Sequence, residues 1–410
     1  MKIKNILLSS IIVLNMFSFC SCSSPRTINT VGYVNLYNEN LKTVKIRVLP
    51  GFNYENLTIP SYVKINGDDY KVTGLYVSDK DDEFFLKDNK YIKHVKVESK
   101  FISTFRYDVF RYTSLETLDI SKATGLGQIG DHAFAYSSSL REVKMAPNVY
   151  RIYKGVFIGT NIKEINFTDT LEEIGINNFF NTPSLEKVNF GNTLKVIPGS
   201  TFEKSAIKHV YGDSINWIDS FAFKNTPRLE TFNVNNAKYI GKEAFYLSNI
   251  GGNIVLNDCV IKASAFRETN IESVSITNTD NIEYKAFGDC KNLTNVSLNG
   301  TIYKIGSNAF VGSKITSIDI PDTCTFIGSE AFKDCYNLES VKLPSSIESI
   351  SSDAFRNCTS LTSIEIPTSI KRIYSGAFLN TKITRVTLSR NVEVMENAFP
   401  SNCVINYCDW

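Results

Sequence analysis

A dipeptide ending in phenylalanine recurs along this chain every 21 to 24 residues, and this repeat constrains the fold more than any other feature. The fourteen anchors are Val109-Phe110, Ala133-Phe134, Val156-Phe157, Phe179-Phe180, Thr201-Phe202, Ala222-Phe223, Ala244-Phe245, Ala265-Phe266, Ala286-Phe287, Ala309-Phe310, Ala331-Phe332, Ala354-Phe355, Ala377-Phe378 and Ala398-Phe399. A repeat of this length cannot bury its own apolar face, so neighbouring copies must stack. Residues 92–410 are therefore predicted to form one repeat array of about 14 copies.

Each copy carries two further signatures. An apolar residue is followed at plus three and plus five by two more, as in Leu338, Val341 and Leu343, and the last two alternate with polar residues as in a half-buried strand. An Ile-x-x-Ile segment, such as Ile302 to Ile305, then returns the chain. We therefore predict a right-handed stack of coils, each with a strand, a short second strand and a helical turn that carries the Ala-Phe. The phenylalanines should form an internal ladder.

The spacing between each Phe and the next strand takes two values. Six residues lead to a Leu, as from Phe332 to Leu338, and five lead to an Ile, as from Phe310 to Ile315; Phe110 and Phe180, with five residues and a Leu, are exceptions.

Three cysteines, Cys290, Cys335 and Cys358, follow the Phe by three residues. Other copies place Thr or Ser there: Thr160, Thr182, Thr269, Thr381, Ser205 and Ser313. Metal ligands would not exchange so freely. This position is therefore interpreted as a tight packing slot.

The copy at residues 327–344, IGSEAFKDCYNLESVKLP, closely follows the pattern Ile-Gly-x-x-Ala-Phe-x-x-Cys-x-x-Leu-x-x-Ile-x-Leu-Pro. The chain thereby resembles the BspA-like leucine-rich repeats of bacterial surface proteins over about residues 92 to 400. The resemblance implies a leucine-rich-repeat solenoid that attaches to host proteins, matrix or other bacteria. The copies from Ile207 to Ile261 depart most: Gly212 replaces an apolar strand residue, and Ile250-Gly251-Gly252-Asn253 is expected to disrupt a strand start and bend the array.

The N-terminus has the layout of an export signal. Lys2 and Lys4 precede an apolar run from Ile6 to Phe19 that is too short to span a bilayer comfortably. The small residue before Cys22 resembles a bacterial lipobox, which implies that residues 1–21 are a lipoprotein signal peptide and that Cys22 is acylated. Plain secretion is the alternative. Localisation at the outer membrane or cell surface follows from the lipoprotein reading.

Residues 22–91 are predicted to be a small all-β domain that caps the first coil. Val44, Ile46 and Val48 alternate with polar residues, and residues 63–72 suggest a hairpin around Asn66-Gly67. An acidic stretch at residues 79–83 is expected to be an exposed loop, with a calcium site as the alternative. At the other end, Cys403 and Cys408 either form a disulfide or remain thiols.

The charges and motifs indicate a protein without catalytic machinery. Lys plus Arg and Asp plus Glu number 42 each once Lys2 and Lys4 leave with the signal, so no basic stripe invites nucleic acid and any membrane attachment is by the lipid alone. The three histidines, His94, His132 and His209, fall in different coils, and no nucleophile, zinc or phosphate-binding motif appears. We expect no enzymatic activity, cofactor or metal.

The outward strand residues should form two parallel rows, one from Lys96 to Thr387 and a companion from His94 to Arg385, rich in Asn, Ser and Thr. An aromatic concentration gives the candidate ligand-binding residues: His209, Tyr211, Asn189, Asn233 and Trp217. Ordinary solvated sheet is the competing interpretation, with Trp217 simply packed.

These observations predict a cell-surface adhesion protein that recognises host or bacterial surface proteins through its repeat sheet. A glycan-binding lipoprotein for nutrient capture is the main alternative, and a structural coat component that self-associates is a third.

Overall fold

The structure, a computed structural model, describes residues 31–38, 41–48, 53–65, 67–75 and 86–409. The predicted signal peptide, the lipidation residue Cys22 and the acidic stretch 79–83 lie outside these residues. The chain divides between Thr193 and Leu194 into two compact units, each described by itself below. Among the described residues there is no helix, and therefore none that could cross a bilayer.

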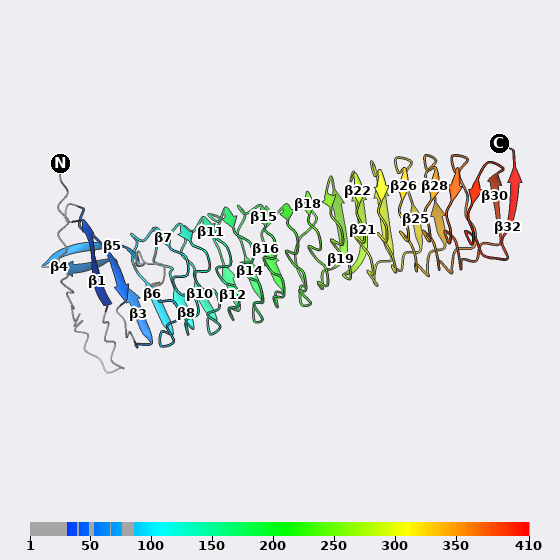
Figure 1. Ribbon diagram of the computed structural model, residues 1–410. Helices are drawn as coiled ribbons and strands as arrows, with labels where there is room; N and C mark the ends of the chain where they lie inside the picture. Colours follow the sequence, from blue (N-terminus) through cyan, green and yellow to red (C-terminus); the bar gives the residue numbers. More distant parts are fainter. Residues whose placement is uncertain (1–30, 39–40, 49–52, 66, 76–85, 410) are drawn as a thin grey trace, which may run out of the picture. The chain divides into compact units, whose positions relative to one another are not determined.

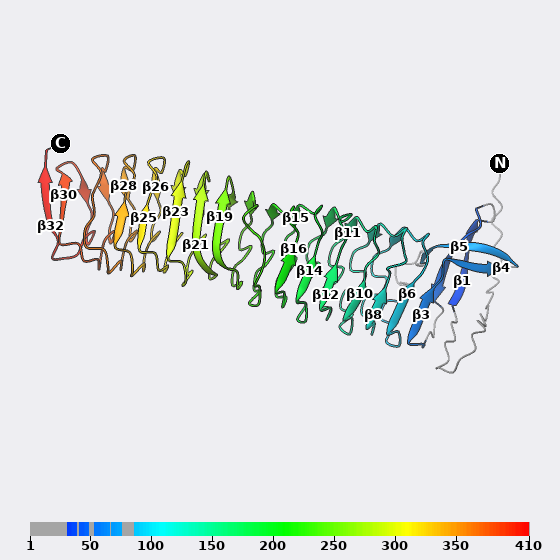
Figure 2. The same cartoon turned by 180° about the vertical axis from the view of Figure 1, so that it is seen from behind.

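In each unit the coils form a leucine-rich-repeat β-solenoid with two strand-bearing sides (Figures 1 and 2). The first strands of the coils form what we call the front sheet, and the return strands form the back sheet; pairing between coils is parallel in both. The first unit has four phenylalanine anchors and the second has ten, which makes about fourteen coils.

In the first unit the front strands are β3 (Asn56–Ile59), β6 (His94–Val97), β8 (Thr117–Asp119), β10 (Glu142–Lys144), β12 (Glu164–Asn166) and β14 (Lys187–Asn189). Its back strands are β7 (Thr104–Phe105), β9 (Gln128–Ile129), β11 (Arg151–Ile152) and β13 (Glu173–Ile174).

In the second unit the front strands are β16 (His209–Tyr211), β19 (Gly251–Asn257), β21 (Asn270–Thr277), β23 (Asn295–Asn299), β25 (Ser317–Asp319), β27 (Ser340–Lys342), β30 (Arg385–Ser389) and β32 (Val404–Cys408). Its back strands are β15 (Val196–Ile197), β17 (Trp217–Ile218), β18 (Tyr239–Ile240), β20 (Val260–Ile261), β22 (Asn281–Ile282), β24 (Lys304–Ile305), β26 (Phe326–Ile327), β28 (Ser349–Ile350), β29 (Arg372–Ile373) and β31 (Glu393–Val394).

The third side of each coil carries the Ala-Phe, and the expectation of a helical turn there is wrong. The residues two before and two after the ladder Phe have positive φ, 59° at Glu330 and 61° at Asp334 around Phe332, and a helix cannot contain such left-handed residues. The main chain instead bonds to the next coil: Phe332 N donates to Ala354 O at 2.8 Å. Hydrogen bonds to the next coil thus alternate with tight-turn bonds inside the coil, such as that from Lys333 N to Glu330 O at 3.2 Å.

The predicted phenylalanine ladder is present in both units. In the second unit the rings from Phe202 to Phe399 stack at centroid separations of 5.0 to 5.5 Å and within 19° of parallel. In the first unit the separations from Phe110 to Phe179 are 5.5 to 5.6 Å. Because these rings are almost all fully buried, the ladder forms the apolar core along each stack.

One anchor was assigned to the wrong residue. Phe179, not Phe180, stacks on Phe157, and Asn178 occupies the Ala position. Asn178 is buried but satisfied: its Oδ1 accepts Val156 N at 3.1 Å, and its Nδ2 donates to two main-chain carbonyls at 2.7 and 2.8 Å. With Phe179 as anchor the spacing to Leu185 is six, so this copy obeys the spacing rule and Phe110 is the remaining exception.

The packing slot three residues after the Phe is confirmed. Cys290, Cys335 and Cys358 are fully buried, and each Sγ donates to the carbonyl oxygen of the Phe one coil earlier, at 3.0 to 3.3 Å. Thr at this position donates instead to the Phe of its own coil, as Thr269 does at 2.8 Å. Both solutions satisfy a buried carbonyl, which explains why small side chains with a donor exchange here.

The N-terminal segment is not separate from the array. Four strands form a sheet in the order β1-β2-β5-β4: β1 (Val31–Asn38), β2 (Thr43–Val48), β4 (Tyr62–Ile65) and β5 (Asp68–Leu75). The hairpin is confirmed, since Val63 pairs with Tyr70 in the antiparallel β4–β5 pair. However, β3 between them pairs in parallel with β6, so residues 56–59 are the first strand of the front sheet and 92 is not a structural boundary.

Two other expectations also change. The Gly251-Gly252 stretch does not break its strand. β19 spans seven residues and pairs with β21 through both glycines, and a bulge at Glu272 of β21 shifts the register after Gly252. At the far end, Cys403 and Cys408 are free thiols. The continuous strand β32 separates them by about 3.3 Å per residue, well beyond the roughly 7 Å that a disulfide tolerates between Cα atoms.

Candidate functional site

The outward rows of the front sheets have the predicted register. In the first unit His94, Thr117 and Glu142 align across three strands, and in the second Val255, Ser275 and Ser297 do so. The parallel pairing keeps equivalent residues directly beside one another because each coil repeats the strand at the same height. The front face of each unit is thus an ordered array of side chains, most of them polar.

His209 and Tyr211 lie side by side on this face in the second unit. Their rings are 6.5 Å apart between centroids, and Tyr211 is 46% exposed. His209 Nδ1 is 3.0 Å from Thr231 Oγ1 in the next coil, and its Nε2 is 3.7 Å from a carboxylate oxygen of Glu230. Tyr211 is the more exposed member of the pair, and His209 is held by its neighbours.

The two candidate asparagines both serve their own strand ends. Asn189 Oδ1 accepts Gly191 N at 3.0 Å in the first unit, and Asn233 Oδ1 accepts Asn235 N at 3.1 Å in the second. Asp119 bonds Ser121 N in the same way. Such bonds, two residues forward, close an Asx turn. This turn chemistry accounts for the frequency of Asn and Asp in the row without a ligand.

Trp217 does not join this group, because it lies in β17 of the back sheet and points outward there, 44% exposed. It stacks on Tyr239 of the next coil, with centroids 4.1 Å apart and planes within 10°. Val196 and Val260 flank the pair in register. One face of each ring is therefore covered by its partner, which leaves mainly ring edges toward solvent.

The three histidines of the chain fall in three different coils. Within the described ranges no three His, Cys, Asp or Glu side chains are placed to hold a metal ion. His94 Nδ1 is 2.9 Å from Thr117 Oγ1, which repeats the arrangement at His209. Burial and the nearby Arg111 lower the pKa of His132, which lies on the third side of its coil.

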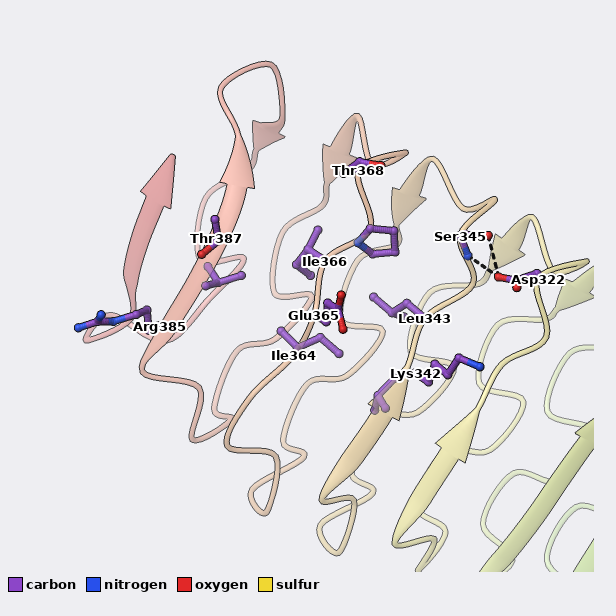
Figure 3. Close-up of a pocket in the computed structure, with 13 residues that line it drawn as sticks. Asp322, Lys342, Leu343, Ser345, Ile364, Glu365, Ile366, Thr368, Arg385 and Thr387 are labelled. Carbon is purple, nitrogen blue, oxygen red and sulfur yellow. Dashed lines mark hydrogen bonds between the residues drawn. The ribbon is translucent and has the colours of Figure 1, made fainter. Parts of the chain in front are cut away.

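Sequence reasoning missed a groove in the front sheet of the second unit (Figure 3). It has a volume of about 1080 Å³ and is lined by thirteen residues of successive coils, the first of them Asp322 and the last Thr387. Lys342 and Glu365 lie on adjacent coils. A signal was available, since Pro321, Pro344 and Pro367 follow the front segment in three successive coils and proline cannot extend a sheet.

A profile described as BspA type leucine rich repeat region, with six copies, matches residues 81–184, 172–294 and 280–406. No curated protein matches the chain.

Several solved structures are similar in fold. A leucine-rich repeat protein from Bacteroides ovatus is 20% identical, with 94% of this chain and 100% of that chain covered and a TM-score of 0.57. A leucine rich cell surface protein from Faecalibacterium prausnitzii is also 20% identical, covering 95% and 96%, with a TM-score of 0.44. The pneumococcal vaccine antigen PcpA is 15% identical, covering 98% and 99%, with a TM-score of 0.33. The first of these likenesses concerns the fold alone.

Proposed function

Because the chain belongs to the BspA-type leucine-rich repeat family, we propose that it is a non-catalytic binding protein of the bacterial surface. It recognises host extracellular proteins or bacterial surface proteins through the front sheet of its repeats. The observation that carries this proposal is the in-register polar face itself. Parallel pairing holds many short donors and acceptors at fixed spacing, so little conformational entropy is lost when a partner binds.

Protein partners are favoured over glycans by the exposed aromatic residues. Trp217 and Tyr239 cover one face of each other, and Tyr112 and Tyr136 stack in the same manner at 5.0 Å. Sugars stack on open ring faces, whereas protein hot spots use the whole amphipathic side chain of Tyr or Trp. Tyr211, at 46% exposure, is the proposed anchor of the front face.

Export and anchoring form the second part of the proposal. Residues 1–21 direct export, and Cys22 carries the lipid that holds the protein at the outer membrane. This anchor presents the front sheet at the cell surface, where it can meet a partner. Intact mass spectrometry of protein extracted from membranes tests this. A lipid adduct on Cys22 is expected, and an unmodified N-terminus would eliminate the anchor.

Binding is tested by interferometry with immobilised fibronectin, laminin and collagen, together with a glycan array. Wild-type protein should bind at least one of the proteins, and Tyr211→Ala should weaken that binding about tenfold. Tyr303→Ala is the matched control, because Tyr303 is 49% exposed and precedes a back strand. Equal binding by the wild type, Tyr211→Ala and Tyr303→Ala would remove Tyr211 from the site. Binding only to a polysaccharide would favour nutrient capture, and self-association alone would favour a coat role.

A further inference from the structure

The front sheet of the second unit is interrupted at two coils. At residues 231–234 only an isolated bridge from Thr231 remains, and at residues 362–366, beside the groove, no strand forms. On one side of β27, Glu339 N donates to Thr316 O at 2.8 Å and Lys342 O accepts from Ile320 N at 3.1 Å. The equivalent bonds on its other side, toward residues 362–366, are not formed. Across the described part of the chain, no hydrogen bond is made by the main chain of residues 362–366. Figure 3 shows this segment running without a strand between its neighbours.

The interruption exposes the apolar interior of the coil. Val341 and Ile364 occupy the middle strand position, which is buried at Ile318 and Val386 on either side, yet both are only half-buried. They form the floor of the groove of about 1080 Å³. A ligand for this groove therefore needs apolar groups that reach the floor and polar groups that satisfy the open main chain.

The rim of the groove carries two charges that are not neutralised locally. Glu365 and Arg385 both line it, and neither has an ion-pair partner among the residues that the structure describes. Lys342 is already paired with Asp319 at 3.3 Å. Asp322 is also engaged, since its Oδ1 accepts both N and Oγ of Ser345 at 2.7 and 2.8 Å. The available charges are thus one carboxylate and one guanidinium on adjacent coils.

We propose that this groove receives an extended peptide segment of a partner protein, which adds to the open main chain of residues 362–366 as a β-strand. Addition of a strand to an unpaired sheet edge supplies affinity through main-chain hydrogen bonds and specificity through alternate side chains. One set of side chains packs on Val341 and Ile364. The other set places an acidic residue beside Arg385 and a basic residue beside Glu365. This inference rests on the protein-binding function proposed above and names the class of partner segment.

A peptide fits the groove better than a glycan does. None of the thirteen lining residues is aromatic, so a sugar ring finds no stacking surface. A peptide supplies both amide groups and branched apolar side chains, which are the two chemistries that the open coil leaves unmatched. The proposed peptide alternates acidic, apolar and basic residues. The chain's own strand β10 has the same pattern, with Glu142 and Lys144 on either side of Val143.

The test uses the peptide acetyl-Thr-Glu-Val-Lys-Leu-Thr-amide, which in parallel register sets Glu beside Arg385 and Lys beside Glu365. Hydrogen–deuterium exchange of the full chain should show fast exchange at the amides of residues 362–366 and protection when the peptide is added at up to about 1 mM. The same peptide with alternate amides N-methylated keeps its side chains but cannot pair as a strand. It should give no protection at these amides.

Two variants give a second readout. Glu365→Lys should weaken peptide binding at least about tenfold, whereas Glu164→Lys, the same charge change on the front strand β12, should leave it unchanged. Absence of protection at 362–366, or equal binding of the N-methylated peptide, overturns the strand-addition proposal. If the chain still binds matrix proteins in that case, the general binding function stands and only this site is lost. If the chain binds no matrix protein but the peptide protects residues 362–366, the peptide site stands and the general binding function is lost.

Discussion

Replacement of one ladder ring measures how much the stacked phenylalanines contribute. Phe332 is fully buried between Phe310 and Phe355, with centroid separations of 5.5 and 5.2 Å and planes within 9°. Phe332→Ala removes the ring from both stacks and leaves a cavity that the neighbouring coils cannot close, because hydrogen bonds hold their spacing. A buried Phe→Ala change costs about 3–5 kcal/mol in unfolding free energy.

Phe326→Ala is the control within the same coil. Phe326 lies in the back strand β26, six residues earlier, and is 44% exposed, so its loss should cost less than about 1 kcal/mol. Both variants remove the same atoms from the same coil. A difference between them therefore reports burial in the ladder and not side-chain chemistry.

Urea unfolding followed by circular dichroism gives the free energies, and hydrogen exchange shows where the loss falls. In a stack with nearest-neighbour coupling, protection should fall first at the amides of Phe310 and Phe332, which donate to Ala331 O and Ala354 O at 2.9 and 2.8 Å. A cost below about 1 kcal/mol for Phe332→Ala, or one equal to that of Phe326→Ala, would refute the ladder as the source of stability.

Three further predictions concern Asn178 and the cysteines. Asn178→Ala restores the commonest residue of that position, yet it should lower the unfolding free energy by about 2 kcal/mol or more. The reason is that it leaves two main-chain carbonyls and one amide without their side-chain partner. Chemical denaturation against the wild type checks this, and an unchanged free energy would contradict it. Burial raises the pKa of Cys335 to about 12. The native thiol then keeps its proton where the unfolded one ionises, so stability should fall as the pH rises from about 9 toward about 12. Iodoacetamide at about pH 8 should modify Cys403, which is only half-buried, before Cys335, and mass spectrometry of the order of labelling would expose the opposite outcome.

Much of the array follows from local pattern alone. Three features repeat once per coil: the strands, the register of the outward rows and the slot that holds Cys335. A copy whose sequence is ambiguous can therefore be aligned with its neighbours. The same redundancy could have located Phe179: counting six residues back from Leu185 selects it, although the Ala-Phe pattern points to Phe180. The candidate binding residues were harder to place, because Tyr211 and Trp217 are near in sequence yet lie on different sheets.

Periodicity in the chain was by itself enough to determine a stacked β-solenoid with an internal column of rings, since only stacking buries a motif that recurs every 21 to 24 residues. Relations between coils were decided only in three dimensions. A Cβ on Gly328 would lie 2.4 Å from Ser307 N of the preceding coil, and the front sheet opens at Ile364. Neither can be inferred from the sequence of a single repeat. The physical reason is that each coil's hydrogen bonds and close approaches are made with its neighbours, so strand pairing is a property of two copies together.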